Sequence, residues 1–214
     1  VFVPLMAPAL FLMGVGPVTR WREDKVMSLA RKLRWALGVS LIAALIAPWL
    51  LGNWKPLVGF GLFLAFWIAT TTFHNLYERL KNHPSPSWAR RIRMQPGSYY
   101  GMLLAHLGVA VFIVGVTIVN GYQIEKDVTM EPGETVTLAD YTFRFDGTSQ
   151  KQGPNYTADV GVLTVTRSGR PVTTLRPERR VYTAGSNPTP MTEASINPGL
   201  TRDLYAALGD RLTD

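Results

Sequence analysis

The chain has 214 residues, of which 47% are hydrophobic and 17% are charged, and its formal net charge is +7. It contains no cysteine, which excludes a thiol nucleophile, a thiolate metal ligand and stabilisation of any exported part by disulfides. The positive charge does not indicate a nucleic-acid-binding protein. Most basic residues of the first half lie in two short clusters between apolar runs, which is typical of loops in a membrane protein.

Long apolar runs predict a membrane all-α region of about four transmembrane helices in residues 1–121. Each run approaches or exceeds the ~20 residues that cross a hydrocarbon core of about 30 Å. The first run contains Pro4, Pro8 and Pro17, so we expect a kinked or shortened helix there. The chain begins with Val1 inside this run, and we expect it to be a piece of a longer polypeptide. The expected helices are 1–18, 35–51, 57–77 and 98–120.

The basic residues predict the orientation of these helices. The connection between the second and third helices carries Lys55 alone, whereas the loops on either side of that pair are rich in lysine and arginine. Basic loops stay on the cytoplasmic side, so everything after Gly121 is expected in the periplasm, next to a bacterial inner membrane. The two basic loops contain Arg20, Arg22, Lys25, Arg31, Lys32 and Arg34, and then Arg79, Lys81, Arg90, Arg91 and Arg93.

From Tyr122 the hydrophobic pattern changes to a period of two, which predicts a small periplasmic β-rich domain, barrel- or sandwich-like, over residues 122–214. One pair of strands is expected within 134–145 around Ala139-Asp140, ending at Asp146-Gly147. Its inward positions would be Val136, Leu138, Tyr141, Phe143 and Phe145.

A second hairpin is expected from 160–166 and 172–175 across Ser168-Gly169. Residues 201–212 are expected to form a short amphipathic helix or turn. A domain of this kind can also lack chemistry of its own, because such folds host many functions.

His106 is the residue that points most directly to chemistry. It lies about eight residues into the fourth expected helix, roughly 11 Å along a helix that rises 1.5 Å per residue. An ionisable side chain at that depth usually lines a cavity, binds a ligand or relays protons, and imidazole is a common axial ligand of haem iron. The alternatives are a proton relay or a hydrogen bond to a neighbouring helix. His74 and His83 are better explained as an interfacial residue and a solvated loop residue.

Residues around His106 admit two interpretations. Gly101, Ala105, Gly108 and Gly115 would form a smooth stripe, which suits either close helix packing or room for a flat macrocycle. Apolar residues on the face of His106 would form pocket walls, namely Met102, Val109, Ala110 and Ile113. In the β-rich domain, Arg179 and Arg180 could contact haem propionates, although such clusters are more often a solvated face.

Three segments resemble the CcmF family of cytochrome c biogenesis proteins, the haem lyase subunit of System I. They are V-F-V-P-L-M-A-P-A-L-F-L-M-G-V-G-P, G-M-L-L-A-H-L-G-V-A-V-F-I-V-G and M-T-E-A-S-I-N-P-G-L-T-R-D-L-Y-A-A-L-G, in the order expected for the family's C-terminal part. They are spread across most of the chain, from residue 1 to residue 209. The A-H-x-G and R-D-L-Y segments are the most specific.

The resemblance implies a function. Members of this family take haem from the chaperone CcmE and help attach it by thioether bonds to apocytochrome c, which is presented with CcmH and CcmI. They also carry a membrane haem b held by two histidines and are thought to draw electrons from quinol. By motif position His106 would be one of the two iron ligands. The lipid bilayer is a further expected partner of the protein.

The family's Trp-rich segment W-G-x-W-W-x-W-D and its other functional histidines do not occur in this sequence. The second haem ligand is therefore expected outside this chain, and no residue of this fragment is expected to be catalytic by itself. Two other functions stay open. One is a paralogous lyase for a specialised multihaem cytochrome, and the other is a transporter or scaffold subunit with a proton-relay or packing histidine.

Overall fold

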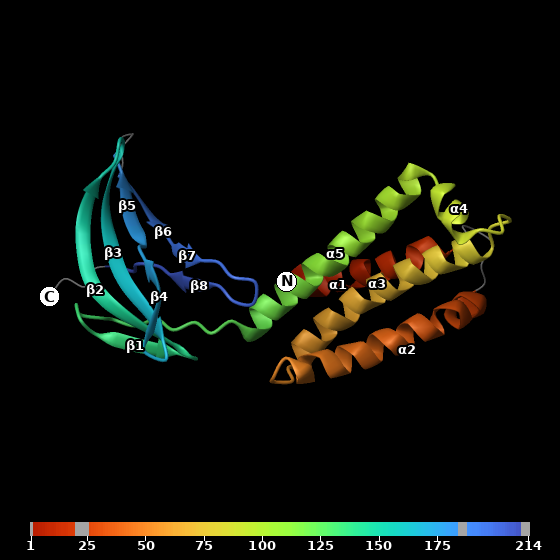
Figure 1. The fold of residues 1–214 in the computed structure, drawn as a ribbon, viewed down its shortest axis with the longest axis horizontal. Helices are drawn as coiled ribbons and strands as arrows, with labels where there is room; N and C mark the ends of the chain where they lie inside the picture. The colour runs from red at the N-terminus through yellow and green to blue at the C-terminus, as the bar shows by residue number, and fades with distance from the viewer. Residues whose placement is uncertain (1, 20–25, 184–187, 211–214) are drawn as a thin grey trace. The chain divides into compact units, whose positions relative to one another are not determined.

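The computed structural model describes residues 2–19, 26–183 and 188–210, which fall into two compact units, Val1–Gln123 and Ile124–Asp214 (Figure 1). The first unit is helical and the second is a curled antiparallel β-sheet, so the predicted fold class is confirmed. The helices are α1 (Phe2–Val15), the 3-10 turn η1 (Gly16–Val18), α2 (Val26–Leu50), α3 (Pro56–Lys81), α4 (Trp88–Arg93) and α5 (Gly97–Tyr122).

Three helices are long and apolar enough to cross a membrane, namely Leu33–Leu50 within α2, all of α3 and all of α5. The first predicted helix is a shorter apolar helix, Leu5–Val18, and Pro8 lies inside it. Helix α2 begins nine residues before the predicted start at residue 35, because Ala, Leu, Arg and Lys in this stretch all favour helix. Arg20, Arg22 and Lys25 of the first basic cluster lie outside the described residues.

Helix α3 is the element on which the other long helices pack. Its Trp67 is buried, stacks on Phe11 of α1 with ring centroids 5.1 Å apart, and donates its indole N–H to the Phe11 carbonyl at 2.8 Å. The core between the helices combines α2, α3 and α5 and consists of Leu33, Ala36, Ala65, Trp67, Ile68, Ala110 and Ile113.

Glycines let α3 and α5 approach closely. A Cβ at Gly61 would collide with the side chain of Thr117, and one at Gly121 would collide with Val58. Small residues at such contacts are the usual means of close packing between helices in a membrane. The two contacts also show that α3 and α5 are antiparallel, because the later residue of α5 contacts the earlier residue of α3.

Polar side chains within these helices are satisfied locally. Thr71 and Thr72 are buried, and their hydroxyls donate to the carbonyls of Trp67 and Ile68, at 2.8 and 2.6 Å. Ser40 of α2, also buried, lies 2.8 Å from the Thr70 hydroxyl of α3. Such bonds matter because an unsatisfied polar group in hydrocarbon costs several kcal/mol, on the order of a lost hydrogen bond or more.

The β unit is one six-stranded sheet with a two-stranded ribbon. The sheet order is β1-β2-β3-β5-β6, β4 also pairs with β3, and every pairing is antiparallel. Its core contains Phe143, Val165, Leu175 and Leu204. The strands are β1 (Thr135–Leu138), β2 (Tyr141–Gln152), β3 (Tyr156–Arg167), β4 (Arg170–Leu175), β5 (Glu178–Tyr182), β6 (Thr189–Glu193), β7 (Ser195–Asn197) and β8 (Leu204–Ala206).

Both predicted hairpins form, with longer strands than predicted, since β3 begins at Tyr156 and β4 at Arg170. Ala139, Ser168 and Gly169 have positive φ, as tight turns at those positions require. Strand β2 does not end at Asp146-Gly147 as predicted but continues to Gln152, because a bulge absorbs the break. Gly147 supplies its positive φ of 124°, and Asp146 accepts a hydrogen bond from the Thr164 hydroxyl at 2.6 Å.

The prediction of a short helix or turn at residues 201–212 is wrong for residues 204–206, which form a strand. Residues 204–206 are β8, paired with β7, and Leu204 is buried in the sheet core. Residues 207–210 have no regular structure, and 211–212 lie outside the described residues. The apolar spacing that indicated a helix reflects burial of Leu204, since a three-residue segment carries too little periodicity to tell helix from strand.

The α3–α5 contact generates a stability prediction. Gly61→Val should destabilise the helical unit by about 1–3 kcal/mol, because the added side chain overlaps Thr117 in a packed interface. Gly101→Val is the matched control, because a Cβ there meets no atom within 4 Å. The measurement is the thermal midpoint of each purified variant in detergent, followed by helical circular dichroism. Equal midpoints for the two variants would contradict the close approach of α3 and α5.

Candidate functional site

His106 lies in α5 and is partly buried. Its Nδ1 is 2.9 Å from the carbonyl oxygen of Met102, one turn earlier in the same helix. A carbonyl oxygen can only accept, so this bond requires the proton on Nδ1. In the neutral ring Nε2 then carries the free lone pair. This is the arrangement found in metal-ligating histidines, whose second nitrogen is held by a backbone carbonyl or carboxylate.

Helical geometry places His106 on the side of α5 that faces α3. The buried residues of α5 are Tyr99, Leu103, Ala110 and Ile113, and residue 106 falls among them at about 100° per residue. The antiparallel contacts of Gly61 with Thr117 and of Gly121 with Val58 put His106 at about the level of Thr72. Helix rotation thus turns His106 toward α3, where it is half-buried.

The four residues predicted as pocket walls divide into two pairs. Ala110 and Ile113 belong to the helical core with Ala65 and Ile68, so their side chains are covered by α3. Met102 and Val109 are half-buried and lie about 40–60° to one side of His106, next to the exposed Ala105. Any flat ligand at His106 would therefore approach over Met102, Ala105 and Val109.

The glycine stripe does not adjoin His106. Gly108 is two residues further along, about 200° around the helix, and Gly101 and Gly115 share its side. A Cβ at any of these three glycines would meet no atom within 4 Å. The three glycines therefore lie away from His106, and no helix of the described residues packs against them. Of the predicted stripe only Ala105 lies near His106, about 100° around the helix, so the prediction that small residues make room beside His106 rests on Ala105.

The other histidines do not converge on His106. His74 is half-buried in α3, two residues from Thr72, which puts it about 200° away around that helix. His83 lies in the loop before α4, where its Nδ1 accepts the Ser85 N–H at 3.2 Å. In the described part of the chain no three His, Cys, Asp or Glu side chains are grouped so that they could hold a metal ion.

The two arginines predicted as propionate contacts already have carboxylate partners. Arg180 of β5 binds Glu178 at 2.8 Å and Glu193 at 3.0 Å, and its guanidinium lies 4.8 Å over the Tyr156 ring. Arg179 pairs with Asp210 and donates to the Gly209 carbonyl at 3.3 Å. A haem carboxylate would have to displace these partners.

Hydrogen bonds shift the pKa values of Glu178 and Arg180 in the directions that favour their charged forms. The pKa of Glu178 is lowered, first by the hydrogen bond from Lys151 and then by that from Arg180. The pKa of Arg180 is raised, first by its bond to Tyr182 and then by that to Glu178. Lys151 lies 2.8 Å from Glu178, so the carboxylate bridges two cations and links β2 to β5.

The R-D-L-Y segment holds the β7–β8 ribbon against the sheet, a role that sequence reasoning missed. Arg202 donates to the Tyr141 hydroxyl at 3.1 Å and to the Asn197 carbonyl at 3.0 Å. Arg167 and Arg202 each lie 5.3 Å from the centroid of the Tyr141 ring. Asp203 accepts the Gly199 N–H at 3.0 Å, which closes the loop between the two strands. The motif itself could have indicated that Arg202 has a structural role, but nothing in the sequence indicated that its partner is Tyr141.

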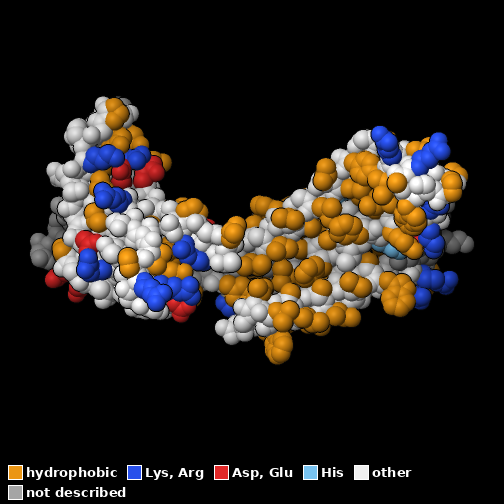
Figure 2. Space-filling view, in the orientation of Figure 1, with side chains coloured by type: hydrophobic (Ala, Val, Ile, Leu, Met, Phe, Trp, Pro, Cys, Tyr) orange, Lys and Arg blue, Asp and Glu red, His pale blue; other side chains and the backbone are white. Residues whose placement is uncertain are grey.

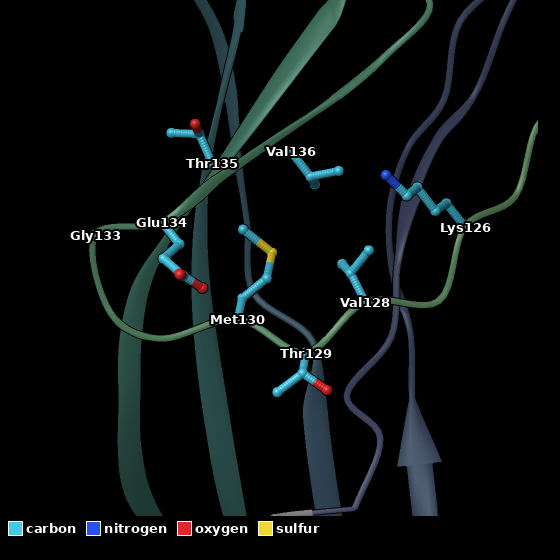
Figure 3. Close-up of a pocket in the computed structure, with 8 residues that line it drawn as sticks. All are labelled: Lys126, Val128, Thr129, Met130, Gly133, Glu134, Thr135 and Val136. Atoms are coloured by element: carbon cyan, nitrogen blue, oxygen red, sulfur yellow. The ribbon is translucent and has the colours of Figure 1, made fainter.

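Two hollows in the described part of the chain are lined by none of the predicted site residues. In the β unit a hollow of about 400 Å³ lies between the segment that precedes β1 and the start of that strand (Figure 3). It is lined by Lys126, Val128, Thr129, Met130, Gly133, Glu134, Thr135 and Val136. In the helical unit an apolar groove of about 270 Å³ lies between α2 and α3, near Trp54 and Phe63.

Comparison with known proteins was made on sequence and on structure. Residues 121–214 match the model of the family described as CcmF C-terminal beta-sandwich. The chain is 38% identical over 213 residues to cytochrome c-type biogenesis protein CcmF of Pseudomonas aeruginosa, which covers 99% of this chain and 31% of that protein. It is 39% identical over 213 residues to CcmF of Escherichia coli K12, with the same coverage of both proteins.

A solved structure named Cytochrome c Heme Lyase CcmF has the same fold, with a TM-score of 0.64 and 22% identity. The similarity covers 92% of this chain and 31% of that one. The chain thus spans about a third of the length of the relatives that it matches. The resemblance to CcmF stated from the sequence motifs is confirmed.

The Glu178 network generates a prediction on pH. Since the folded pKa of Glu178 is lowered, its stabilising effect is present above the ordinary carboxyl value of 4.5 and is lost as the pH falls through the folded pKa. The thermal midpoint of the β unit, followed by β-sheet circular dichroism, should therefore decline more steeply below about pH 4.5 in the wild type than in Glu178→Gln. Glu125→Gln, at an exposed position on the segment before β1, should keep the wild-type profile. An unchanged profile in Glu178→Gln would contradict this assignment.

Proposed function

We propose that this chain, which corresponds in sequence and fold to part of CcmF, supplies His106 as one axial ligand of a membrane haem b in a cytochrome c haem lyase. The observation that carries the proposal is the hydrogen bond from His106 to the Met102 carbonyl, which directs the free lone pair to Nε2. The relatives named cytochrome c-type biogenesis protein or heme lyase support a role in cytochrome c biogenesis.

The residues around His106 fit such a group. The imidazole is a neutral nitrogen donor on a rigid helix, and its orientation is fixed by a partner of the same helix. Beside it, exposed Ala105 leaves space, and Met102 and Val109 offer apolar contact. Bis-histidine haem, when bound, supplies one-electron redox chemistry, while this chain's residues bind and orient it. We assign the second axial histidine to a part of the protein outside this chain.

The remaining roles follow from the family. We propose that haem arrives from the chaperone CcmE and is joined by thioether bonds to apocytochrome c, which is presented with CcmH and CcmI, and that quinol is the electron source. The reacting thiols belong to the apocytochrome. This chain has no cysteine that could compete by thiol exchange. The fragment by itself is not proposed to be catalytic.

We also propose an orientation in the inner membrane. The end of the helical unit that carries Arg79, Lys81 and α4 would face the cytoplasm, by the preference of basic loops for that side. The α2–α3 turn with Lys55 would face the periplasm. The chain leaves α5 at Tyr122 on that same side, so the β unit would be periplasmic.

The competing function is a transporter or scaffold in which His106 relays protons or only packs. Its bond to Met102 within the same helix is compatible with packing. A paralogous lyase for a specialised multihaem cytochrome would use His106 in the same way as the proposed one, so it differs in substrate and not at this site.

The dithionite-reduced optical spectrum of the full-length protein that contains this chain tests the assignment. His106→Ala should remove or shift the α-band of the b-type haem, because it deletes one of two axial ligands. His106→Gly should regain a low-spin spectrum when imidazole is added. His83→Ala is the matched control and should keep the wild-type spectrum, since His83 lies in the loop before α4.

Two results would count against the proposal. A wild-type protein that purifies without haem would favour the transporter or scaffold function. A haem spectrum that is unchanged in His106→Ala would keep the family assignment but leave His106 with a packing role only.

A further inference from the structure

Most basic residues of the helical unit gather at one end, whereas Lys55 lies in the turn between α2 and α3. Figure 2 shows Lys and Arg side chains at the end that carries α4 in Figure 1, beside a surface that is largely hydrophobic. Residues 77–100 contain five Lys or Arg residues and one acidic residue, Glu78. This excess of positive charge belongs to a single short connection between two candidate membrane spans, α3 and α5.

Side-chain hydrogen bonds order this connection. Arg91 of α4 donates to the carbonyls of Leu80 and Lys81, at 2.9 and 3.3 Å, and so caps the C-terminal end of α3. Gln95 accepts a hydrogen bond from Arg79 at 2.6 Å and donates to the Arg91 carbonyl at 3.1 Å. These bonds hold α4 at a fixed place against the end of α3.

Aromatic contacts fix the same segment. Trp88 stacks on Tyr77 of α3 with ring centroids 6.4 Å apart. The Arg91 guanidinium lies 5.3 Å over Trp88, and the Lys81 ammonium lies 5.8 Å over Tyr77. Alternating cations and aromatic rings at the end of an apolar helix are typical of the membrane–water interface.

Helix α4 presents one apolar and one basic face. Trp88 and Ile92 are one turn apart and remain 50% and 47% exposed. Arg90 and Arg93, also one turn apart, are exposed, and neither side chain makes an ion pair or hydrogen bond with any residue that the structure describes. Their charges are therefore available to a partner outside the chain.

We propose that α4 lies in the membrane–water interface and binds anionic phospholipid headgroups through Arg90 and Arg93. The chain enters α5 at Gly97, four residues after Arg93, so α4 cannot be more than about 14 Å from the start of that span. Trp88 and Ile92 enter the border of the acyl region. The guanidinium forks of Arg90 and Arg93 meet the phosphates, which match their geometry.

Charge and exposure together favour a lipid over other anionic partners. A nucleic acid or an acidic protein would use the arginines but would leave Trp88 and Ile92 in water, whereas a lipid surface accommodates both faces at once. The occupant is thus an anionic phospholipid of the surrounding leaflet. This inference does not depend on haem binding at His106.

The test uses the full-length protein that contains this chain, in nanodiscs of phosphatidylcholine with or without phosphatidylglycerol. The lipids that stay with the protein after mild detergent extraction are quantified by mass spectrometry. Phosphatidylglycerol should be enriched on the wild type. Enrichment should fall roughly 30-fold in Arg90→Gln/Arg93→Gln, since each basic residue near an anionic surface contributes about fivefold. Arg90→Lys/Arg93→Lys should retain most of it.

Arg170→Gln/Arg176→Gln removes the same charge from exposed positions of the β unit and should behave as the wild type. Equal enrichment in the Arg90→Gln/Arg93→Gln variant and the wild type would overturn the proposal.

A second measurement does not require the arginines to be removed. The chain has no cysteine, so Ala89→Cys gives a single labelling site on α4 for the environment-sensitive dye NBD in a full-length protein from which any cysteine elsewhere has been removed. NBD emission should be brighter and shifted to the blue in discs with phosphatidylglycerol. Emission that is the same in both kinds of disc, or that changes equally on adding inorganic phosphate to phosphatidylcholine discs, would refute a lipid-headgroup site.

Discussion

The close approach of α3 and α5 is the contact on which the helical unit and its candidate site depend. It exists because Gly61 and Gly121 have no side chain where Thr117 and Val58 must lie. In a bilayer apolar burial does not drive helices together, so van der Waals contact at small residues and interhelical hydrogen bonds must do so. Tyr99 adds one such bond by donating to Asn75 at 2.7 Å, and Asn75 in turn donates to the Pro17 carbonyl at 2.6 Å.

This contact explains the placement of His106. The rotation of α5 that buries Ala110 and Ile113 against α3 also turns the half-buried His106 toward α3, with the half-buried Met102 and Val109 to one side of it. The same rotation turns Gly101, Gly108 and Gly115 away from both α3 and His106. One helix thus has a face packed within the chain, which includes His106, and a side with three glycines where an added Cβ would meet no atom of the described chain within 4 Å.

The β unit and the connection between α3 and α5 differ in how many of their basic side chains have partners within the chain. In the β unit several basic side chains have internal partners, since Arg179, Arg180 and Arg202 pair with carboxylates, carbonyls or an aromatic ring. In the connection between α3 and α5, Arg91 is paired in the same way, but the side chains of Arg90 and Arg93 have no such partner among the described residues. The number of arginines in the sequence therefore identifies basic segments. Only the structure shows which arginine side chains are unpaired and can bind a partner outside the chain.

The sequence by itself determined the helical and β-rich halves, the long apolar helices, the two β-hairpins and the CcmF resemblance. These depend on apolar run length, a period of two and local turn residues such as Ser168-Gly169, all of which are short-range properties. Tertiary structure decided what depends on partners distant in the chain. Leu204 is a strand residue because it pairs with β7 and packs in the sheet core. Strand β2 continues past Asp146 because a bulge absorbs the break and Thr164 donates a hydrogen bond to Asp146. Likewise, only the packing of α5 on α3 sets which side of the helix His106 occupies, and only the carboxylates around Arg180 show that its charge is already neutralised. A linear pattern lists the groups that can interact, but the folded chain selects which of them do.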